Sequence, residues 1–317
     1  MRAIRYYEHG GPDVLQVADV PVPEPADGQV LIEVEAVGAN AIDTMFRRGD
    51  GPWTRPLPGA LTGDVVGRIT RLGPNVPPGV QAGQRVAAVS EDAFAEQVAV
   101  DAEWLAPIPE DADAGEATTL SMPAPLALRL LKAGRVAPGE TVLIQSAAGG
   151  IGHLAVQLAR ALDAGTVIGT ASSSHKLDFI RSQGADLAID LSADDWTEQL
   201  PPVDVVLDSV GGKTFDQGLQ AIAPLGRMVS YGAISGELPT IPAGSLFTLK
   251  SVTGVSTLAW RAARPAEARD DITEVTRLWQ TGELRPAIDT RFSFTEVSRL
   301  HKILDDRTNL GRLVVTF

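Results

Sequence analysis

A run of small residues joins a strand pattern to a helix pattern in TVLIQSAAGGIG, residues 141–152. Four apolar or β-branched residues precede the small ones, and the apolar helical pattern IGHLAVQLARAL continues the segment. A helix N-terminus carries about half a positive charge and several unpaired N–H groups, which favour a pyrophosphate when no large side chain intervenes. The segment therefore predicts the first βα unit of a dinucleotide-binding domain, with a purely structural glycine turn as the alternative.

The small residues match the GxGxxG fingerprint with one substitution. Ala147, Gly149 and Gly152 occupy the three glycine positions, and Gly150 lies beside them. Because the first position is alanine, the turn is a variant, and the pattern alone is a weak signal. The strand before it and the helix after it make the signal strong.

Strand and helix patterns alternate after this turn. The strand patterns are TVIGTA, LAID, VDVVLDSVG, GRMVSYG and SVTGVS, and the helix patterns between them include SHKLDFIRSQG and TFDQGLQAI. Alternation at this spacing predicts an α/β fold of the Rossmann type, a doubly wound parallel sheet with helices on both faces.

The first 118 residues show a different pattern. Short alternating or apolar runs such as VLIEVEAV and QRVAAV are separated by Pro- and Gly-rich segments, which predicts a small all-β barrel or sandwich. At 317 residues, the chain is long enough for two domains. We expect a β domain over 1–118, a nucleotide-binding domain over 119–256, and a segment over 257–317 that returns to the first domain.

Composition excludes several classes of function. The net charge is −13 without a dense basic cluster, so nucleic acid is not an expected partner. No apolar run approaches the ~20 residues of a membrane span, and the N-terminus lacks a signal-peptide pattern, so a cytoplasmic protein without a membrane partner is expected. The chain has no cysteine and its four histidines are far apart, so no metal site is expected.

The residues after the second strand of the nucleotide-binding domain predict which dinucleotide binds. An NAD site normally has Asp or Glu about 20 residues after the last glycine, bonded to the ribose 2′-hydroxyl. Here Ser172, Ser173 and Ser174 precede His175 and Lys176, and no carboxylate is present. Hydroxyl groups and a cation favour a 2′-phosphate, so the pattern predicts NADPH. The alternative is a serine that caps the next helix, with Lys176 facing solvent.

With these features, the chain resembles the zinc-free quinone oxidoreductase (zeta-crystallin-like) branch of the medium-chain dehydrogenases/reductases over essentially its full length. The resemblance rests on VGANAIDTMFRRG, AGQRVAAV, SAAGGIG, DSVGG, GRMVSYG and GRLVV. It implies a GroES-like β-barrel domain at the N-terminus, a Rossmann domain after it, and a homodimer formed through edge strands of the Rossmann domain. The apolar segment LFTLKSVTGVS is a candidate for that edge.

The resemblance also implies roles for individual residues. Asn40 and Asp43 match residues that line the nicotinamide and substrate end, and they are the candidate catalytic residues. Cofactor contacts are implied, besides Asn40, for Ala147, Gly149, Gly150, Ile151, Ser172, Ser173, Lys176, Ser209, Gly211, Gly232, Ala233, Thr253, Gly254, Val255 and Arg312. Where the family often has polar side chains, this chain has Met45, Leu126 and Leu191, which predicts a more apolar substrate site and leaves Lys176 as the main 2′-phosphate anchor.

The expected chemistry is hydride transfer to an acceptor that spreads developing negative charge without a metal, as quinones and α,β-unsaturated carbonyl compounds do. A dedicated enoyl reductase of a biosynthetic pathway and a catalytically silent NADPH-binding regulatory protein are the alternatives. Arg47 is four residues after Asp43, and a surface i,i+4 pair between them is expected. Candidates for the wall of the substrate pocket are Met45, Trp53, Phe247 and Trp260.

Overall fold

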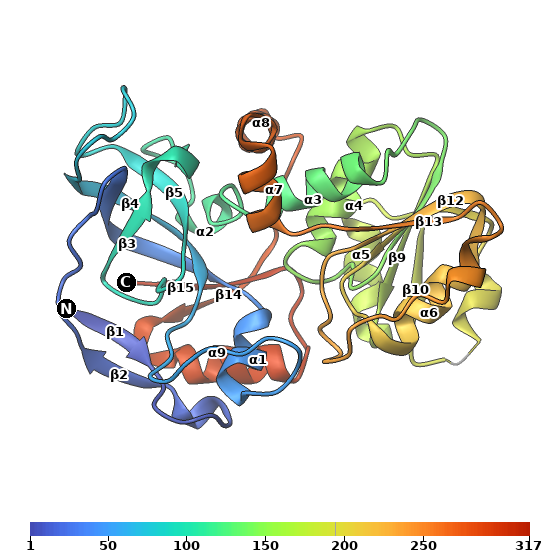
Figure 1. Ribbon diagram of the computed structural model, residues 1–317, viewed down its shortest axis with the longest axis horizontal. Helices are drawn as coiled ribbons and strands as arrows, with labels where there is room; N and C mark the ends of the chain where they lie inside the picture. The colour runs from blue at the N-terminus through green and yellow to red at the C-terminus, as the bar shows by residue number, and fades with distance from the viewer. Residues whose placement is uncertain (194) are drawn as a thin grey trace. The chain divides into compact units, whose positions relative to one another are not determined.

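The computed structural model describes residues 1–193 and 195–317. The chain forms two compact units: the first contains Met1–Met122 and Pro286–Phe317, and the second contains Pro123–Arg285. Both ends of the chain lie among the strands of the first unit (Figure 1). Among the described helices, none is long and apolar enough to cross a membrane.

The first unit is built on a mainly antiparallel sheet. Its strands are β1 (Arg2–Arg5), β2 (Gln16–Asp19), β3 (Gln29–Ala39), β4 (Gly63–Leu72), β5 (Arg85–Ser90), β6 (Gln97–Asp101), β7 (Ala106–Pro107), β14 (Ile288–Ser293) and β15 (Arg312–Thr316). The main sheet has the order β14-β15-β3-β4-β5-β7, β6 also pairs with β3, and β1 and β2 form a separate pair. The last strand of the chain is thus a neighbour of β3, as the expected C-terminal return implies (Figure 1).

Short helices complete the first unit: α1 (Ile42–Arg48), α2 (Ala114–Ala117) and α9 (Val297–Asp305). Two of them, α1 and α2, fall inside the span expected to be all β. Met45 and Phe46 of α1 are buried. The burial of these apolar side chains stabilises a short helix that the strand-like patterns around it conceal.

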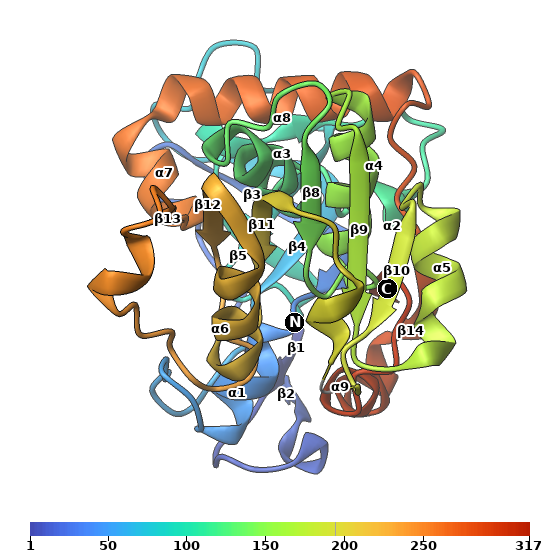
Figure 2. The same cartoon turned by 90° about the vertical axis from the view of Figure 1, so that its right-hand side faces the viewer.

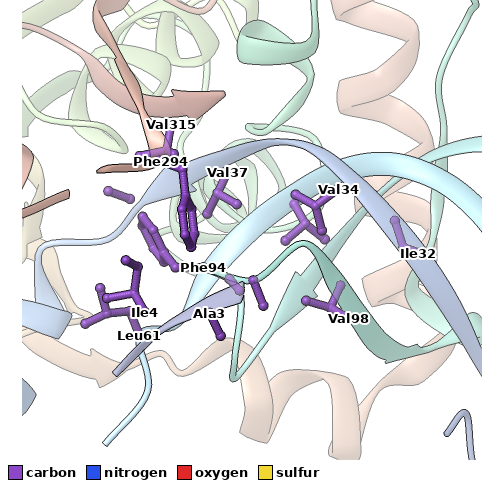
Figure 3. Packing of buried hydrophobic residues seen from close by; sticks show 14 of the residues in the cluster. Ala3, Ile4, Ile32, Val34, Val37, Leu61, Phe94, Val98, Phe294 and Val315 are labelled. Carbon is purple, nitrogen blue, oxygen red and sulfur yellow. The ribbon is translucent and has the colours of Figure 1, made fainter. Parts of the chain in front are cut away.

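A bulge in β3 decides which of its side chains enter the core of the first unit. Ile32 and Val34 lie in this core before the bulge, and Val37 lies in it afterwards (Figure 3). The pairing register of β3 with β4 shifts directly after Val34, which moves the inward face from even to odd residue numbers. Gly38, an even-numbered position of β3 beyond the bulge, therefore lies on the face away from the core, and Asn40 directly follows the end of the strand.

The second unit is a parallel sheet with helices packed on it. Its strands are β8 (Thr141–Ile144), β9 (Thr166–Ala171), β10 (Leu187–Asp190), β11 (Val203–Asp208), β12 (Ile222–Ser230) and β13 (Ser251–Gly254). All of its ladders are parallel, and the order β10-β9-β8-β11-β12-β13 is that of a doubly wound dinucleotide-binding sheet. The α/β prediction is confirmed.

Helices of the second unit pack against its strands or against one another (Figure 2). They are α3 (Pro123–Ala133), α4 (Gly152–Ala161), α5 (Leu177–Ser182), α6 (Gly212–Ala221), α7 (Thr257–Ala263) and α8 (Pro265–Gln280). The sheet core contains Leu143, Ile168, Val206, Phe215 and Met228. Phe215 comes from α6 and the other side chains come from strands of the sheet. The uniform apolar pattern of the strands therefore reflects a sheet covered by helices.

The division of the chain differs from the expected segments at two boundaries, and residues 119–122 belong to the first unit. Residues 257–285, which were expected to return to the first domain, belong to the second unit. The cause is packing: α8 buries Ile272 and Val275 and contacts α3, while Asp271 of α8 accepts hydrogen bonds from Arg129 and Lys132 of α3. Only the chain from residue 286 onward rejoins the first unit.

Candidate cofactor and active site

The small-residue turn connects the end of β8 to the start of α4. Ser146 has a left-handed backbone (φ 53°), and its carbonyl oxygen accepts a hydrogen bond from the N–H of Gly149 (2.9 Å). A Cβ atom on Gly152 would lie 2.2 Å from that same oxygen, so only glycine fits there. Ala147 is fully buried, and its N–H donates to the carbonyl of Thr170 on β9 (2.9 Å). The turn is thus held to the sheet on one side, while Gly149 and Gly150 remain half-buried at the start of α4, beside Ile151.

Two further sets of predicted residues meet at the ends of neighbouring strands. Ser209 and Gly211 follow β11, and Gly232 and Ala233 follow β12, its parallel neighbour. A Cβ on Gly232 would lie 3.0 Å from the carbonyl oxygen of Ser209, so the two loops are in close contact. These carboxyl ends of parallel strands are where ligands bind in open α/β sheets.

Asp208, which sequence reasoning did not single out, shapes this edge. Its carboxylate accepts hydrogen bonds from the backbone N–H groups of Val210 (3.1 Å) and Gly211 (3.2 Å). Burial raises the pKa of Asp208 to about 6, and these hydrogen bonds oppose the rise. Its position directly before SVGG, at the end of an apolar run, was the signal available in the sequence.

The last predicted strand end, Thr253 to Val255, lies at the edge of the sheet. Thr253 and Gly254 end β13, which pairs on one side only, with β12. The N–H of Val255 donates to the carbonyl of Ser230 (2.9 Å). A Cβ on Gly254 would meet no atom within 4 Å, so glycine is not required there by the surrounding chain.

The candidate 2′-phosphate segment follows β9. Ser172 is exposed and Ser173 is half-buried. The alternative of a serine cap is wrong, because the Ser173 side chain makes no capping bond and its hydroxyl lies 3.0 Å from Nδ1 of His175. The alternative of a solvent-facing Lys176 is also wrong, because that residue is only 6% exposed.

In the first unit, Asp43 is a buried carboxyl group at the start of α1. It is 1% exposed and accepts hydrogen bonds from the backbone N–H and the hydroxyl of Thr62, both at 2.9 Å. Burial raises the pKa of Asp43 to about 7, and the two bonds from Thr62 oppose the rise. A carboxyl group in this state holds and releases a proton near neutral pH.

The expected surface pair between Asp43 and Arg47 is wrong. Arg47 is fully buried, and its Nη2 donates to Asp305 on α9 (2.5 Å). Helix α9 packs on α1, so Arg47 finds its partner across two helices rather than four residues away on its own helix.

Arg312 and Asn40 meet at a buried ion pair. Arg312 is 2% exposed; one terminal amino group donates to Asp64 on β4, and the other donates to Oδ1 of Asn40 (3.1 Å). Ser121 donates its hydroxyl to Asp64 (3.3 Å). Burial raises the pKa of Asp64, and the adjacent Arg312 guanidinium and the hydrogen bond from Asn40 oppose the rise.

The four residues expected to wall the substrate pocket are in different surroundings. Met45 is 2% exposed inside the first unit, Trp53 is 38% exposed and Phe247 is 84% exposed. The guanidinium carbon of Arg129 lies 4.0 Å from the centre of the Trp260 ring, and both residues line a small hollow in the second unit. Leu126 lines the same hollow.

The fold and these sites define an NAD(P)-binding oxidoreductase of two domains, and comparison with known proteins agrees. Residues 26–110 match the alcohol dehydrogenase GroES-like domain, and residues 150–277 match the zinc-binding dehydrogenase family. The chain belongs to the medium-chain dehydrogenase/reductase superfamily, in the branch that contains quinone oxidoreductases, VAT-1 homologues and prostaglandin reductases.

Individual relatives span nearly the whole chain. A quinone oxidoreductase of Pseudomonas aeruginosa is 31% identical over 99% of both chains. An NADPH-dependent alkenal/one oxidoreductase of Arabidopsis thaliana is 30% identical over 99% of this chain and 79% of its own length. A mycobacterial protein solved in complex with NADPH has a TM-score of 0.92 and 32% identity, with both chains fully covered.

The zinc in the description of one family does not fit this chain. The sequence has no cysteine, and the part of the chain that the structure describes holds no group of three His, Cys, Asp or Glu side chains placed for a metal ion. The dinucleotide fits better, because a Cβ at Gly152 would displace the turn against which a pyrophosphate would lie.

Proposed function

We propose that this protein uses NADPH, without a metal, to reduce a quinone or an α,β-unsaturated carbonyl compound. The observation that supports it most is the turn at 146–152, where the carbonyl oxygen of Ser146 leaves room for no side chain on Gly152. The segment 172–176 after β9 contains hydroxyl groups and a cation but no carboxylate. The acceptor classes follow from the chemistry below and agree with the names of the two relatives above.

The second unit supplies the residues that would hold the dinucleotide. Backbone N–H groups of Gly149, Gly150 and Ile151 would face the pyrophosphate at the start of α4. Ser172, Ser173 and Lys176 would contact the 2′-phosphate, which carries the negative charge that a cation attracts. Further contacts would come from the strand ends at Ser209, Gly211, Gly232, Ala233, Thr253, Gly254 and Val255.

The first unit supplies the polar groups for the reacting end. When bound, NADPH supplies a hydride, and reduction of a conjugated acceptor also requires one proton. Burial raises the pKa of Asp43 to about 7, so this carboxyl group would exchange a proton near neutral pH. Asn40 would donate a hydrogen bond to an oxygen of the acceptor or of the nicotinamide ribose, and Arg312 contacts Asn40 directly.

The electronic demand of the reaction selects the acceptor. Hydride addition places negative charge on the acceptor, which a Lewis acid or an extended π-system must stabilise. No group of metal ligands occurs in the described chain. Quinones and enones delocalise this charge themselves, whereas simple ketones do not.

Two measurements test the proposal together. Fluorescence titration gives the dissociation constants of NADPH and NADH, and steady-state assays with NADPH use a 1,4-naphthoquinone and a straight-chain alkenal as acceptors. We expect tighter binding of NADPH and turnover of at least one acceptor. Tight NADPH binding without turnover of either would overturn the proposal and favour a silent regulatory protein. Within the proposal, strong preference for one enone with negligible turnover of the quinone would favour a dedicated enoyl reductase.

A further inference from the structure

Three neighbouring strands bring Arg312, Gly38 and Asp64 together. In the sheet order β15-β3-β4, Gly38 of β3 pairs with Val314 of β15 on one side and with Asp64 of β4 on the other. Arg312 is two residues before Val314, so both side chains leave β15 on the same face. To reach Asp64, the Arg312 side chain therefore has to cross β3.

Gly38 makes that crossing possible. A Cβ atom on Gly38 would lie 2.4 Å from both Nε and Nη2 of Arg312 and 2.7 Å from the hydroxyl of Thr118. The guanidinium thus lies directly on the glycine backbone. Any side chain at position 38 would push it away from Asp64.

The ion pair in turn fixes the side-chain amide of Asn40. Arg312 has only donors, so it must face the amide oxygen of Asn40, as the 3.1 Å bond shows. The carboxylate of Asp64 has only acceptors and is stabilised by the Asn40 side chain, so the amide nitrogen of Asn40 faces Asp64. With both partners present, the amide has one possible orientation.

One donor of Asn40 remains for a ligand. The amide nitrogen carries two hydrogens, and at most one of them can be directed at Asp64. Within the described residues the other hydrogen has no partner, and Asn40 is half-buried rather than enclosed. Its bond to Arg312, whose side chain leaves β15 on the face away from the hydrophobic core, places it on that face.

We infer that Asp64 and Arg312 are a positioning pair, which with Gly38 holds the Asn40 amide so that its free N–H meets an oxygen acceptor of the bound ligand. The acceptor is a carbonyl oxygen of the substrate or a hydroxyl of the nicotinamide ribose. The inference rests on the proposed function for the identity of that ligand. It makes Asp64 and Gly38 part of the site, although neither touches the reacting atoms.

The asparagine content of the chain allows a direct test. Only Asn40, Asn75 and Asn309 are present, so selective ¹⁵N-asparagine labelling gives three side-chain NH₂ signals. The Asn40→Asp variant identifies the signal of Asn40. Asn75, which donates to Asp27, is the internal reference.

Two variants disturb the pair by different means. Gly38→Ala displaces the guanidinium without changing a polar group, and Arg312→Lys keeps the charge but cannot bridge two acceptors. Both are expected to move the Asn40 signals and leave those of Asn75 in place. Arg291→Lys, which changes an exposed ion pair with Asp113 in the same unit, is the matched control and should move neither.

A double-mutant cycle separates positioning from general stability. Gly38→Ala should lower kcat/KM or NADPH affinity about tenfold, the value of one hydrogen bond. In the Asn40→Ala background, Gly38→Ala should have no further effect, because the amide that the Asp64–Arg312 pair positions is absent. A change in the KM of the acceptor identifies the substrate as the ligand, and a change in the Kd of NADPH identifies the ribose.

Each other outcome decides against the inference. Unmoved Asn40 signals in both variants would overturn it, as would an equal loss from Gly38→Ala in the wild-type and Asn40→Ala backgrounds. If the wild-type protein reduces neither acceptor, the proposed function fails, and the cycle is read from the Kd of NADPH alone. An unchanged Kd in that case would overturn the positioning role as well.

Discussion

A Cβ atom on Gly152 would lie 2.2 Å from the carbonyl oxygen of Ser146 and 2.7 Å from Cα of Ala147. Both are backbone atoms of the turn, so Gly152→Ala must move the turn itself. We expect a loss of about 1–3 kcal/mol in unfolding free energy, typical of overpacking, and at least a tenfold weaker NADPH affinity. Urea denaturation and fluorescence titration measure the two effects.

The control for this substitution lies in the same unit. A Cβ at Gly244 would meet no atom within 4 Å, so Gly244→Ala should leave both values nearly unchanged. Equal NADPH affinity in Gly152→Ala and wild type would show that the turn does not hold the pyrophosphate.

Ser172→Asp tests the choice of dinucleotide. The residue is exposed at the end of β9, so a carboxylate there is accommodated without repacking. It would repel a 2′-phosphate and accept a bond from a 2′-hydroxyl. We expect the Kd of NADPH to rise about tenfold, equivalent to about 1.4 kcal/mol, while that of NADH stays equal or falls. A parallel rise for both cofactors would contradict the assignment of the segment.

The stability of the protein should depend on the protonation of His301. This side chain of α9 is fully buried, and burial, with the nearby Arg47 charge, lowers its pKa to about 3 from 6.5. In the folded protein the His301 imidazole stays neutral, whereas in the unfolded chain it binds a proton as the pH falls below 6.5. The contribution is therefore complete above pH 6.5 and is lost as pH falls towards 3, by at most about 1.4 kcal/mol per pH unit.

Urea unfolding at pH 7 and pH 5 measures this loss. His301→Gln should flatten the decline between the two, since glutamine does not titrate. His175→Gln, at an exposed position, is the matched control and should leave the decline as in the wild type. If the unfolding free energy of His301→Gln still declines steeply from pH 7 to pH 5, the decline belongs to another titrating group.

The contribution of Asp43 to the free energy of unfolding depends on pH in the opposite direction. Its pKa is raised to about 7 from 3.8, so the folded state favours the protonated form. That contribution is complete below pH 3.8 and is lost as pH rises through 7, again by at most about 1.4 kcal/mol per unit. Asp43→Asn should thus gain stability relative to wild type as pH rises from 4 to 7.

The same variant reports on catalysis. If Asp43 delivers the proton, Asp43→Asn should lower kcat at least tenfold at neutral pH without changing the Kd of NADPH. Thr62→Val removes one of the two bonds to Asp43 and should shift the pH profile of kcat upward, because that bond favours the ionised form. An unaltered pH profile in both variants would remove Asp43 from the reaction.

We further propose that the protein forms a homodimer through β13. This strand is an edge of the six-stranded sheet, and Phe247 and Leu249 before it are 84% and 68% exposed. Light scattering should give about twice the chain mass of 33.4 kDa. Combined Phe247→Asp and Leu249→Asp should give the monomer, whereas Leu72→Asp, on the first unit, should not. A wild-type monomer would refute this interface.

Local patterns made much of the second unit predictable. Strands buried on both faces appear as continuous apolar runs such as TVIGTA, and the turn before α4 needs small residues for reasons that act within six positions of the chain. The strand order then follows from chain order and handedness, which few alternatives satisfy. Asn40 and Asp43 were named from a resemblance, not from any local pattern.

The partners of those polar residues depended on the tertiary structure. Asp64 and Arg312 are 248 positions apart, and Arg47 reaches Asp305 rather than Asp43. Likewise, α8 joined the second unit because its apolar face packs on α3. The sequence by itself determined the strands and helices of the second unit, since periodicity and turn chemistry are local. Only the fold decided which charges meet, because burying a charge requires a partner, and any element that packs nearby can supply one.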